Sequence, residues 1–379
     1  MMDVLTLNII PAPTPFPNLS SYTVKEIKDW AKASNLKAPS GLKKADLIQY
    51  LAGAYSERLS GNSDLGKNMT MPLDILQPRY VNAEINWMTH LHTYGWSVVP
   101  IPHWNPNFTN MFFSWLESYC SDFNRHDHKT WKVANLPPMD HNVFKHYFGH
   151  TELQWQIREL CIPIFTQIWH CDPEDLLCSF DGGCFMPPKP KATTFRNWVH
   201  SDQPESIRHL ACVQGIVNFE ENGPIDGGLI LVEGSNTIFS EYMDKHPSEG
   251  ITWGLSDMTD PLLSTRPLVK ICAPAGSIIL FDSRTFHCNV APSGPVLKLD
   301  GAPRFRMCTY VSMQPRGGAS KNEIFKRMTL YERGRMTGHW CYGKYFKETP
   351  EHPHFGHKHT EPVEIAPLNY LRGRLIGYD

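Results

Sequence analysis

Residues 194–203 read TFRNWVHSDQ, an aromatic-rich segment that ends in the triplet His200–Ser201–Asp202 and its following glutamine. Because side chains alternate between the two faces of a strand, His200 and Asp202 point the same way if this segment is extended. An imidazole and a carboxylate in that arrangement can share one metal ion. The triplet alone is a weak signal of a metal site. Because it supplies only two ligands, a third ligand has to come from elsewhere in the chain.

The third candidate ligand follows a second apolar strand. Residues 277–290 read SIILFDSRTFHCNV, and their apolar run leads to His287. Two histidines and one carboxylate form a facial set that occupies one side of an octahedral Fe(II) ion and leaves three positions open. The sequence therefore predicts a catalytic iron site at His200, Asp202 and His287, with the ligands on two strands of one barrel.

Five segments between about residues 175 and 315 occur in an order that resembles the phytanoyl-CoA dioxygenase-like family of Fe(II)/2-oxoglutarate oxygenases. They read WVHSDQ, ACVQGIVNF, GGLILVEGSN, FDSRTFHCN and RMCTYVSMQP. The resemblance implies an α+β fold: a double-stranded β-helix, which is a jelly-roll or cupin-like barrel, flanked by helices. It also implies an Fe(II)/2-oxoglutarate-dependent dioxygenase, a hydroxylase that uses Fe(II), the co-substrate 2-oxoglutarate and O₂.

The resemblance further implies residues that surround the co-substrate. An arginine after the distal histidine would hold the far carboxylate of 2-oxoglutarate, since a guanidinium binds a carboxylate through two parallel hydrogen bonds. Arg304 and Arg306 lie on one face of the next predicted strand; the register favours Arg306, and Arg304 is the alternative. Gln214 and Asn289 are further candidates, with ordinary strand positions as the alternative.

Some positions depart from the family pattern. Glu233 and Asn236 stand where the family has the proline and histidine of a PGSH turn, and we expect them to alter the rim of the site rather than the metal. The interval between His287 and the arginine strand is longer than is usual in the family. The turn-rich insertion at residues 291–303 is expected to form a loop. Halogenases of this fold replace the metal-binding carboxylate with a small residue, so Asp202 predicts hydroxylation or a related oxidation.

A compact unit near the N-terminus, residues 19–54, has the pattern of two short helices. Thr23 and Glu26 have the spacing of a capping box, and Ile27 belongs to an apolar set at helical spacing. A turn with proline and glycine precedes a second helix, which directs Leu47 inward. The pattern resembles the SAP motif, a helix–extended loop–helix module that binds DNA and sometimes RNA.

The charge of this unit agrees with that resemblance. Residues 20–60 carry seven basic and four acidic residues, a net charge of +3 in a chain whose total is −2. Lys37, Lys43 and Lys44 are the predicted phosphate contacts, since lysines supply such contacts to DNA or RNA. The alternative is a helical hairpin that binds protein and whose lysines are merely solvated.

Composition and the absence of targeting patterns limit the class of protein. A near-neutral chain of 379 residues with 41% hydrophobic and 12% aromatic residues is typical of a folded enzyme, and it excludes a bulk polyanion binder. No apolar run reaches the ~20 residues that a membrane helix needs. The start of the chain lacks the basic region of a signal or transit peptide. Ten scattered cysteines without a CxxC pair predict reduced, buried thiols in an intracellular protein, which is nuclear, nucleoprotein-associated or cytoplasmic.

The predicted organisation has five parts: a proline-rich leader (1–18), the SAP-like hairpin (19–54), a linker (55–78), the oxygenase domain (79–320), and a C-terminal helix with a histidine-rich extension (321–379). Apolar helices are expected at 107–120 and 152–170, the second interrupted by Pro163, and another at 319–335. The histidines of the extension are expected in a surface loop, with a metal site as the alternative. They are His352, His354, His357 and His359.

Two functions are compatible with these patterns. The first is an oxygenase that the SAP-like hairpin brings to nucleic acid. The second is a catalytically inactive barrel that acts as a nucleic-acid-associated structural or binding protein. Members of the resembled family act on lipids, amino acids and alkaloid-like molecules, so the resemblance selects no substrate.

Overall fold

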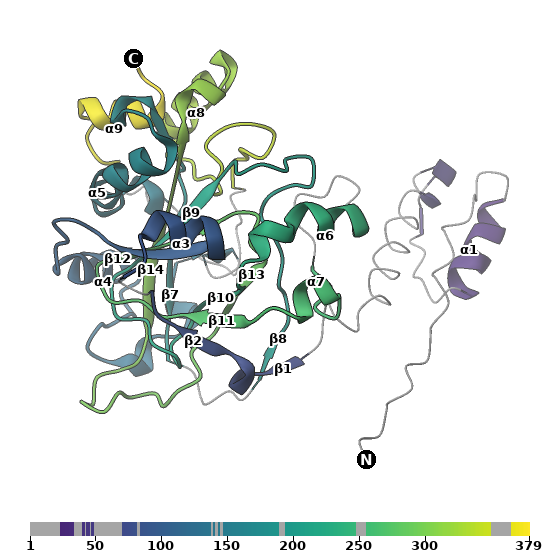
Figure 1. The fold of residues 1–379 in the computed structure, drawn as a ribbon, viewed down its shortest axis with the longest axis horizontal. Coiled ribbons are helices and arrows are strands. Elements are labelled where there is room, and N and C mark those ends of the chain that lie inside the picture. The colour runs from purple at the N-terminus through teal and green to yellow at the C-terminus, as the bar shows by residue number, and fades with distance from the viewer. Residues whose placement is uncertain are drawn as a thin grey trace. The chain divides into compact units, whose positions relative to one another are not determined.

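The structure is a computed structural model that describes residues 23–33, 40–41, 43–45, 47–48, 70–81, 84–137, 139–140, 143–144, 147–188, 194–247, 255–349 and 365–379. The chain divides into two compact units, residues 1–69 and 70–379. The leader 1–18, Lys37 and the four histidines of the C-terminal extension lie outside the described residues. All strands of the described residues belong to the second unit (Figure 1).

The first unit contains helix α1 (Val24–Ala33). The expected capping box is present: the Thr23 backbone N–H donates to Glu26 Oε2 (2.7 Å), and the Glu26 N–H donates to Thr23 Oγ1 (3.3 Å). Ile27 on α1 and Leu47 in the next helical stretch are fully buried. Gly41, between the two, has a φ of 90°, a conformation that glycine adopts without strain.

The larger of two central sheets has the strand order β3-β12-β9-β14-β7-β5-β4, and β6 also pairs with β14. All of its pairings are antiparallel. Its strands are β3 (Trp96–Pro100), β4 (Met139–Asp140), β5 (Val143–Phe144), β6 (Leu176–Cys178), β7 (Gly183–Met186), β9 (Val213–Asn218), β12 (Ser277–Asp282) and β14 (Arg306–Pro315).

The smaller sheet has the order β13-β10-β11-β2, in which only the β11–β2 pair is parallel. Its strands are β2 (Gln77–Arg79), β10 (Gly228–Val232), β11 (Leu268–Ile271) and β13 (His287–Val290). A further pair joins β1 (Thr70–Pro72) to β8 (Thr194–Arg196). Residues 70–78, the end of the predicted linker, therefore belong to β1, the short turn after it and β2 of the second unit.

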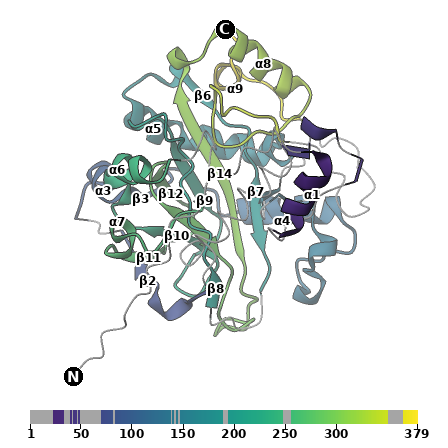
Figure 2. The same ribbon diagram turned by 90° about the vertical axis from the view of Figure 1, so that its right-hand side faces the viewer.

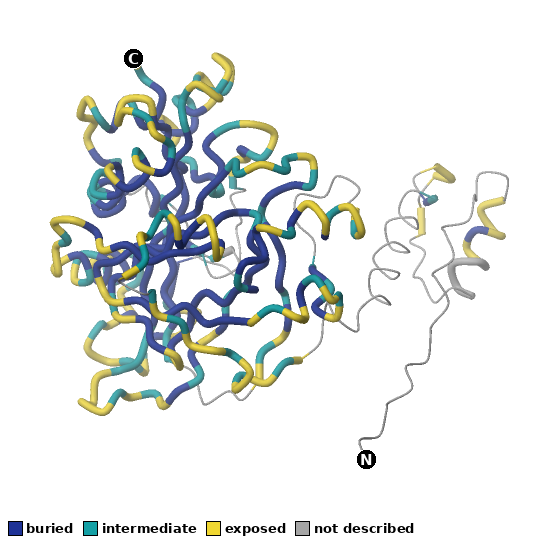
Figure 3. The backbone as a smooth tube through the Cα atoms, in the orientation of Figure 1, coloured by how far each residue is buried: buried dark blue, intermediate teal, exposed yellow. Residues whose placement is uncertain are grey.

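The two sheets pack face to face. Trp96 and Ile279 of the larger sheet lie in one buried cluster with Leu231 and Ile271 of the smaller sheet. Alternation along each strand directs the remaining side chains outward, where two further clusters join the sheets to helices. The fold is thus of the α+β class, with helices outside two large sheets (Figures 1 and 2). Burial is concentrated in the central strands of these sheets, and the surrounding helices and loops carry many exposed residues (Figure 3).

Helices cover both outer faces. The outer face of the larger sheet packs against α3 (Trp87–Tyr94), α4 (Phe108–Tyr119), α5 (Glu152–Trp169), α8 (Lys321–Glu332) and α9 (Tyr370–Ile376). The smaller sheet packs against α6 (Phe239–Lys245) and α7 (Pro261–Ser264). The helices predicted near 107–120, 152–170 and 319–335 are present as α4, α5 and α8.

One expectation for α5 was wrong, because the helix continues through Pro163. An interior proline costs a helix roughly 3 kcal/mol through the lost hydrogen bond and a steric clash. The buried face of α5, which includes Trp155 and Phe165, stabilises the helix enough to offset this. Thr166 Oγ1 and Gln167 Nε2 also donate to the Pro163 carbonyl.

The cysteines are free thiols, as predicted. Cys120 and Cys171 are partly exposed, and the other eight are buried. In the part of the chain that the structure describes, no helix combines the length and the apolar character that crossing a membrane requires.

Candidate metal centre

The structure brings the three predicted ligands together. One ligand atom from each of His200, Asp202 and His287 lies within 4.8 Å of the others. His200 Nε2 is 3.4 Å from Asp202 Oδ1, and His287 Nε2 is 3.4 Å from Asp202 Oδ2. Among the described residues, no other cluster of three or more His, Cys, Asp or Glu side chains has this geometry.

An isolated backbone bridge places the two histidines side by side. His287 N–H donates to the His200 carbonyl (2.8 Å), and His200 N–H donates to the His287 carbonyl (2.9 Å). Residue 200 is thereby added to the edge of the smaller sheet beside β13. The N–H of Asp202 donates to the Ser283 carbonyl (3.2 Å), in the turn that connects β12 to β13.

The ligand pair does not lie on a regular strand, contrary to the expectation from its spacing. Strand β8 ends at Arg196, and Asp202 is in a loop. Asn197 Oδ1 accepts a hydrogen bond from the Val199 N–H (3.0 Å). Such a local side-chain bond competes with strand pairing, which explains why the strand stops before His200.

Backbone carbonyls orient both imidazoles. His200 Nδ1 is 3.0 Å from the Trp198 carbonyl oxygen, and His287 Nδ1 is 2.9 Å from the Thr285 carbonyl oxygen. Because a carbonyl can only accept, Nδ1 of each ring carries the proton. The Nε2 lone pairs are then free to bind a metal, and this orientation by a backbone carbonyl is usual for metal-binding histidines.

The electrostatics of the cluster favour a cation. Burial raises the pKa of the Asp202 carboxyl, but the nearby His339, His200 and His287 side chains hold it well below its usual range. Burial lowers the pKa of His200, and the charge of Asp202 outweighs this and raises it. Asp202 is therefore an anion at neutral pH, which is the form that binds a metal.

Gln214 lies on β9 and contacts one of the ligands directly. Its Nε2 donates to Asp202 Oδ2 (2.9 Å) and lies 3.3 Å from Ser283 Oγ. Sequence reasoning placed Gln214 beside the co-substrate and missed this contact with the carboxylate. The contact joins β9 to the loop that carries Asp202, 12 residues away in the chain, and no local pattern in the sequence signals it.

Asn289 and Trp198 flank the histidines. Asn289 follows His287 on β13, its Oδ1 is buried without a hydrogen-bond partner among the described residues, and its carbonyl accepts from Trp198 Nε1 (2.9 Å). The Trp198 ring stacks on His200 with 5.2 Å between the ring centroids. Trp198 therefore forms part of the wall beside the ligands and ties the His200 segment to β13.

The two candidate arginines have different environments. Arg304 precedes β14, and its Nη1 is 2.6 Å from Asp226 Oδ1. Arg306 is the first residue of β14 and is 2% exposed. Because side chains alternate along a strand, it shares the inward face of β14 with Cys308, a member of the core between the sheets.

Arg306 is a buried cation without a carboxylate partner among the described residues. Its Nε, Nη1 and Nη2 are all buried and make no hydrogen bond. Burial lowers the pKa of the guanidinium, but the neighbouring Cys308, Tyr310 and Cys184 side chains raise it above its ordinary value. A buried guanidinium without a hydrogen-bond partner is costly, and this one is suited to bind an anion.

Glu233 and Asn236, the two residues that depart from the family's PGSH turn, form hydrogen bonds with groups other than the metal ligands. Glu233 accepts from Trp96 Nε1 (3.3 Å) and forms an ion pair with Arg79 (3.5 Å). Asn236 Nδ2 donates to the His92 carbonyl (3.0 Å). These contacts join the turn after β10 to β2, β3 and α3.

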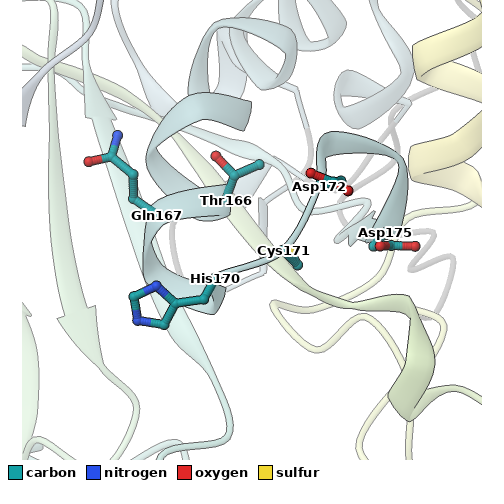
Figure 4. Close-up of a pocket in the computed structure, with 6 residues that line it drawn as sticks. All are labelled: Thr166, Gln167, His170, Cys171, Asp172 and Asp175. Atoms are coloured by element: carbon teal, nitrogen blue, oxygen red, sulfur yellow. The ribbon is translucent and has the colours of Figure 1, made fainter.

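A surface hollow lies at the end of α5 and contains none of the predicted site residues (Figure 4). It is lined by Thr166, Gln167, His170, Cys171, Asp172 and Asp175. These side chains do not belong to the metal-binding cluster, and we assign no function to the hollow.

Comparisons with known proteins add distant likenesses. No protein-family model matches the chain. Ava biosynthesis cluster protein O of Aspergillus versicolor is 25% identical over 266 residues, which cover 65% of this chain and 83% of that protein. The solved structure of the epimerase SnoN with Fe3+, alpha ketoglutarate and nogalamycin RO has a TM-score of 0.42 and 12% identity, covering 60% of this chain and 82% of SnoN.

A second solved structure, HygX from Streptomyces hygroscopicus with nickel and 2-oxoglutarate bound, has a TM-score of 0.38 and 12% identity. It covers 62% of this chain and 87% of HygX. At these scores the likenesses identify neither the family nor the activity of this chain, and the proposals below rest on its own residues.

Proposed function

We propose that the protein is an Fe(II)- and 2-oxoglutarate-dependent dioxygenase of the phytanoyl-CoA dioxygenase-like type, a hydroxylase that couples 2-oxoglutarate decarboxylation to substrate oxidation. The two facing sheets would then be its double-stranded β-helix. The observation that carries the proposal is the pairing of a His–Asp–His cluster with a buried, unneutralised arginine in the core between the same two sheets.

The donor set suits Fe(II). Two imidazole nitrogens and one carboxylate oxygen are the facial ligands of non-haem iron oxygenases. His200 and His287 would hold the ion through Nε2, and Asp202 would hold it through one oxygen. Bound Fe(II), with 2-oxoglutarate and O₂, supplies the oxidising chemistry, while the protein supplies orientation and a water-poor pocket.

Arg306 supports the choice of co-substrate. A dicarboxylate can present one end to the metal and place the other against the guanidinium, where two parallel hydrogen bonds form. This pairing would neutralise the buried charge. Arg304 is the weaker candidate because Asp226 already neutralises it.

The test measures metal and co-substrate binding together with succinate formation. We expect the protein with Fe(II) to bind 2-oxoglutarate and release succinate, and His200→Ala and Asp202→Ala to lose both. Gln167→Ala, at the surface hollow, is the matched control and should behave as the unaltered protein. Failure of the metal-loaded protein to bind or decarboxylate 2-oxoglutarate would favour the alternative, an inactive barrel with a structural role.

We also propose that the first unit directs the enzyme to DNA or RNA inside the cell. Lys25, Lys28, Lys43 and Lys44 are all exposed, and Lys37 is a further predicted contact. Exposed lysines on a small folded unit release counterions when they meet phosphates. The free, mostly buried thiols are compatible with a reducing intracellular compartment.

This second proposal is tested by charge reversal. Lys43→Glu with Lys44→Glu should weaken binding to DNA or RNA and reduce the salt dependence by about one unit of slope per lysine. The control is Lys129→Glu with Lys132→Glu, which reverses two exposed lysines of the second unit. A salt slope unchanged by the first pair would contradict a phosphate contact there.

A further inference from the structure

The two histidine ligands and the aspartate ligand are held in different ways. Backbone carbonyls of Trp198 and Thr285 orient the two histidines. The Asp202 carboxylate instead accepts a hydrogen bond from the side chain of Gln214. A carbonyl contact survives substitution of its residue, whereas the contact to Asp202 depends on the identity of residue 214.

Gln214 sits on a firmly positioned strand. In β9 it pairs with Phe281 of β12 on one side and with Ser312 of β14 on the other. It is 8% exposed and shares the inward face of the strand with Ile216, a member of the core between the sheets. A group on a strand with neighbours on both sides is a better anchor than the loop that carries Asp202.

The contact also determines which way the amide faces. A carboxylate can only accept, so the amide NH₂ of Gln214 must point to Asp202 Oδ2. The same NH₂ lies 3.3 Å from Ser283 Oγ, and the Ser283 carbonyl accepts the backbone N–H of Asp202 and of Gln203. Gln214 and Ser283 thus hold both the side chain and the backbone of the ligand.

We propose that Gln214 is a positioning residue that fixes the Asp202 carboxylate, so that Oδ2 is engaged by the amide and Oδ1 faces the metal. This inference rests on the proposed metal centre and assigns Gln214 a role distinct from contact with the co-substrate. Without the amide, the carboxylate is free to rotate and to present both oxygens to the ion. Both the affinity for metal and the geometry around it then change.

Two variants test this role. Gln214→Met keeps the length of the side chain and removes the donor, while Gln214→Glu keeps its shape and places an acceptor against the carboxylate. The matched control is Asn218→Ala, which removes another buried, inward-facing amide from β9. Asn218 Nδ2 has no hydrogen-bond partner among the described residues, so its loss should leave Asp202 in place.

The readouts are the dissociation constant for Co(II) without co-substrate, the visible absorption spectrum of the Co(II) protein, and the Tm of the metal-free protein. We expect Gln214→Met to weaken metal binding by about 10–100-fold, the usual effect of losing a group that orients a ligand. Gln214→Glu should weaken it further, and both should alter the Co(II) spectrum. Asn218→Ala should match the unaltered protein in metal binding and spectrum.

The outcomes separate this inference from the proposed function. If the unaltered protein does not bind Co(II), the metal centre itself is wrong. If it binds Co(II), and Gln214→Met binds equally with the same spectrum, the positioning role is wrong. The positioning role is also wrong if Gln214→Met changes only the affinity for 2-oxoglutarate. A fall in metal-free Tm equal to that of Asn218→Ala, with weakened metal binding in Gln214→Met alone, supports positioning rather than general destabilisation.

Discussion

Arg306 carries a charge at a position where a charge is costly. Its guanidinium is buried between two sheets, and no group of the described residues forms a hydrogen bond with it. An apolar side chain of similar length would pack there without this cost. We therefore attribute the arginine at this position to the proposed binding of an anion rather than to stability.

Arg306→Met should have opposite effects on stability and on co-substrate binding. We expect the free energy of unfolding of the metal-free protein to rise by roughly 1–4 kcal/mol, because an uncompensated buried charge is removed. Binding of 2-oxoglutarate to the metal-loaded protein should be lost. Urea denaturation and a 2-oxoglutarate titration measure the two effects.

Arg304→Met is the comparison for this prediction. It breaks the ion pair with Asp226 and should retain 2-oxoglutarate binding. Loss of binding in Arg304→Met with normal binding in Arg306→Met would assign the co-substrate to the other arginine.

At the scale of elements, one buried side chain of α8 bonds to several other elements of the second unit. The helix begins with a capping box between Ser320 and Glu323. Further along, Arg327 donates to four backbone carbonyls, those of Cys178, Cys341, Leu375 and Ile376. These carbonyls come from β6, from the segment after α8 and from α9, so one guanidinium satisfies acceptors that would otherwise be buried without a donor.

Arg327→Leu should destabilise the protein by about 3 kcal/mol or more, because each buried carbonyl left without a donor costs roughly 1–3 kcal/mol. The C-terminal helix should also become sensitive to proteolysis. Arg333→Leu, at the exposed end of α8, is the control and should change stability little. Urea denaturation and limited proteolysis measure both effects; equal stability of the two variants would contradict the proposed role of Arg327.

At the scale of the whole molecule, the chain consists of two units with separate cores. Ile27 and Leu47 are buried in the first unit, and the sheets with their helices form the second. The candidate metal ligands, Gln214 and Arg306 all belong to the second unit. Catalysis and nucleic-acid binding are therefore proposed for different units.

Removal of residues 1–69 should separate the two functions. The remaining chain, residues 70–379, is expected to keep its Tm, its metal binding and its succinate formation, because its core and site are intact. Its affinity for DNA or RNA should fall sharply. Thermal unfolding, the succinate assay and a binding titration test this; loss of folding on truncation would show that the units are not independent.

Much of the local structure follows from the sequence alone, because neighbouring residues determine it. The Thr23–Glu26 capping box, helices α4, α5 and α8, and the strand that leads to His287 are all visible as short-range patterns. The candidate ligands were also recognisable, because five segments occur in the order that is typical of a family with a His–Asp–His iron site. These signals depend on side-chain periodicity and on hydrogen bonds that span a few residues.

The tertiary structure decided which groups become partners across the fold. The register of the sequence favours Arg306 over Arg304, but only the folding of Asp226 against Arg304 leaves Arg306 as the buried charge without a carboxylate partner. The position of Asp202 in a loop and its bond to Gln214 have the same origin. The physical reason is that burial and charge neutralisation depend on residues far apart in the chain, whose approach is set by the packing of the two sheets.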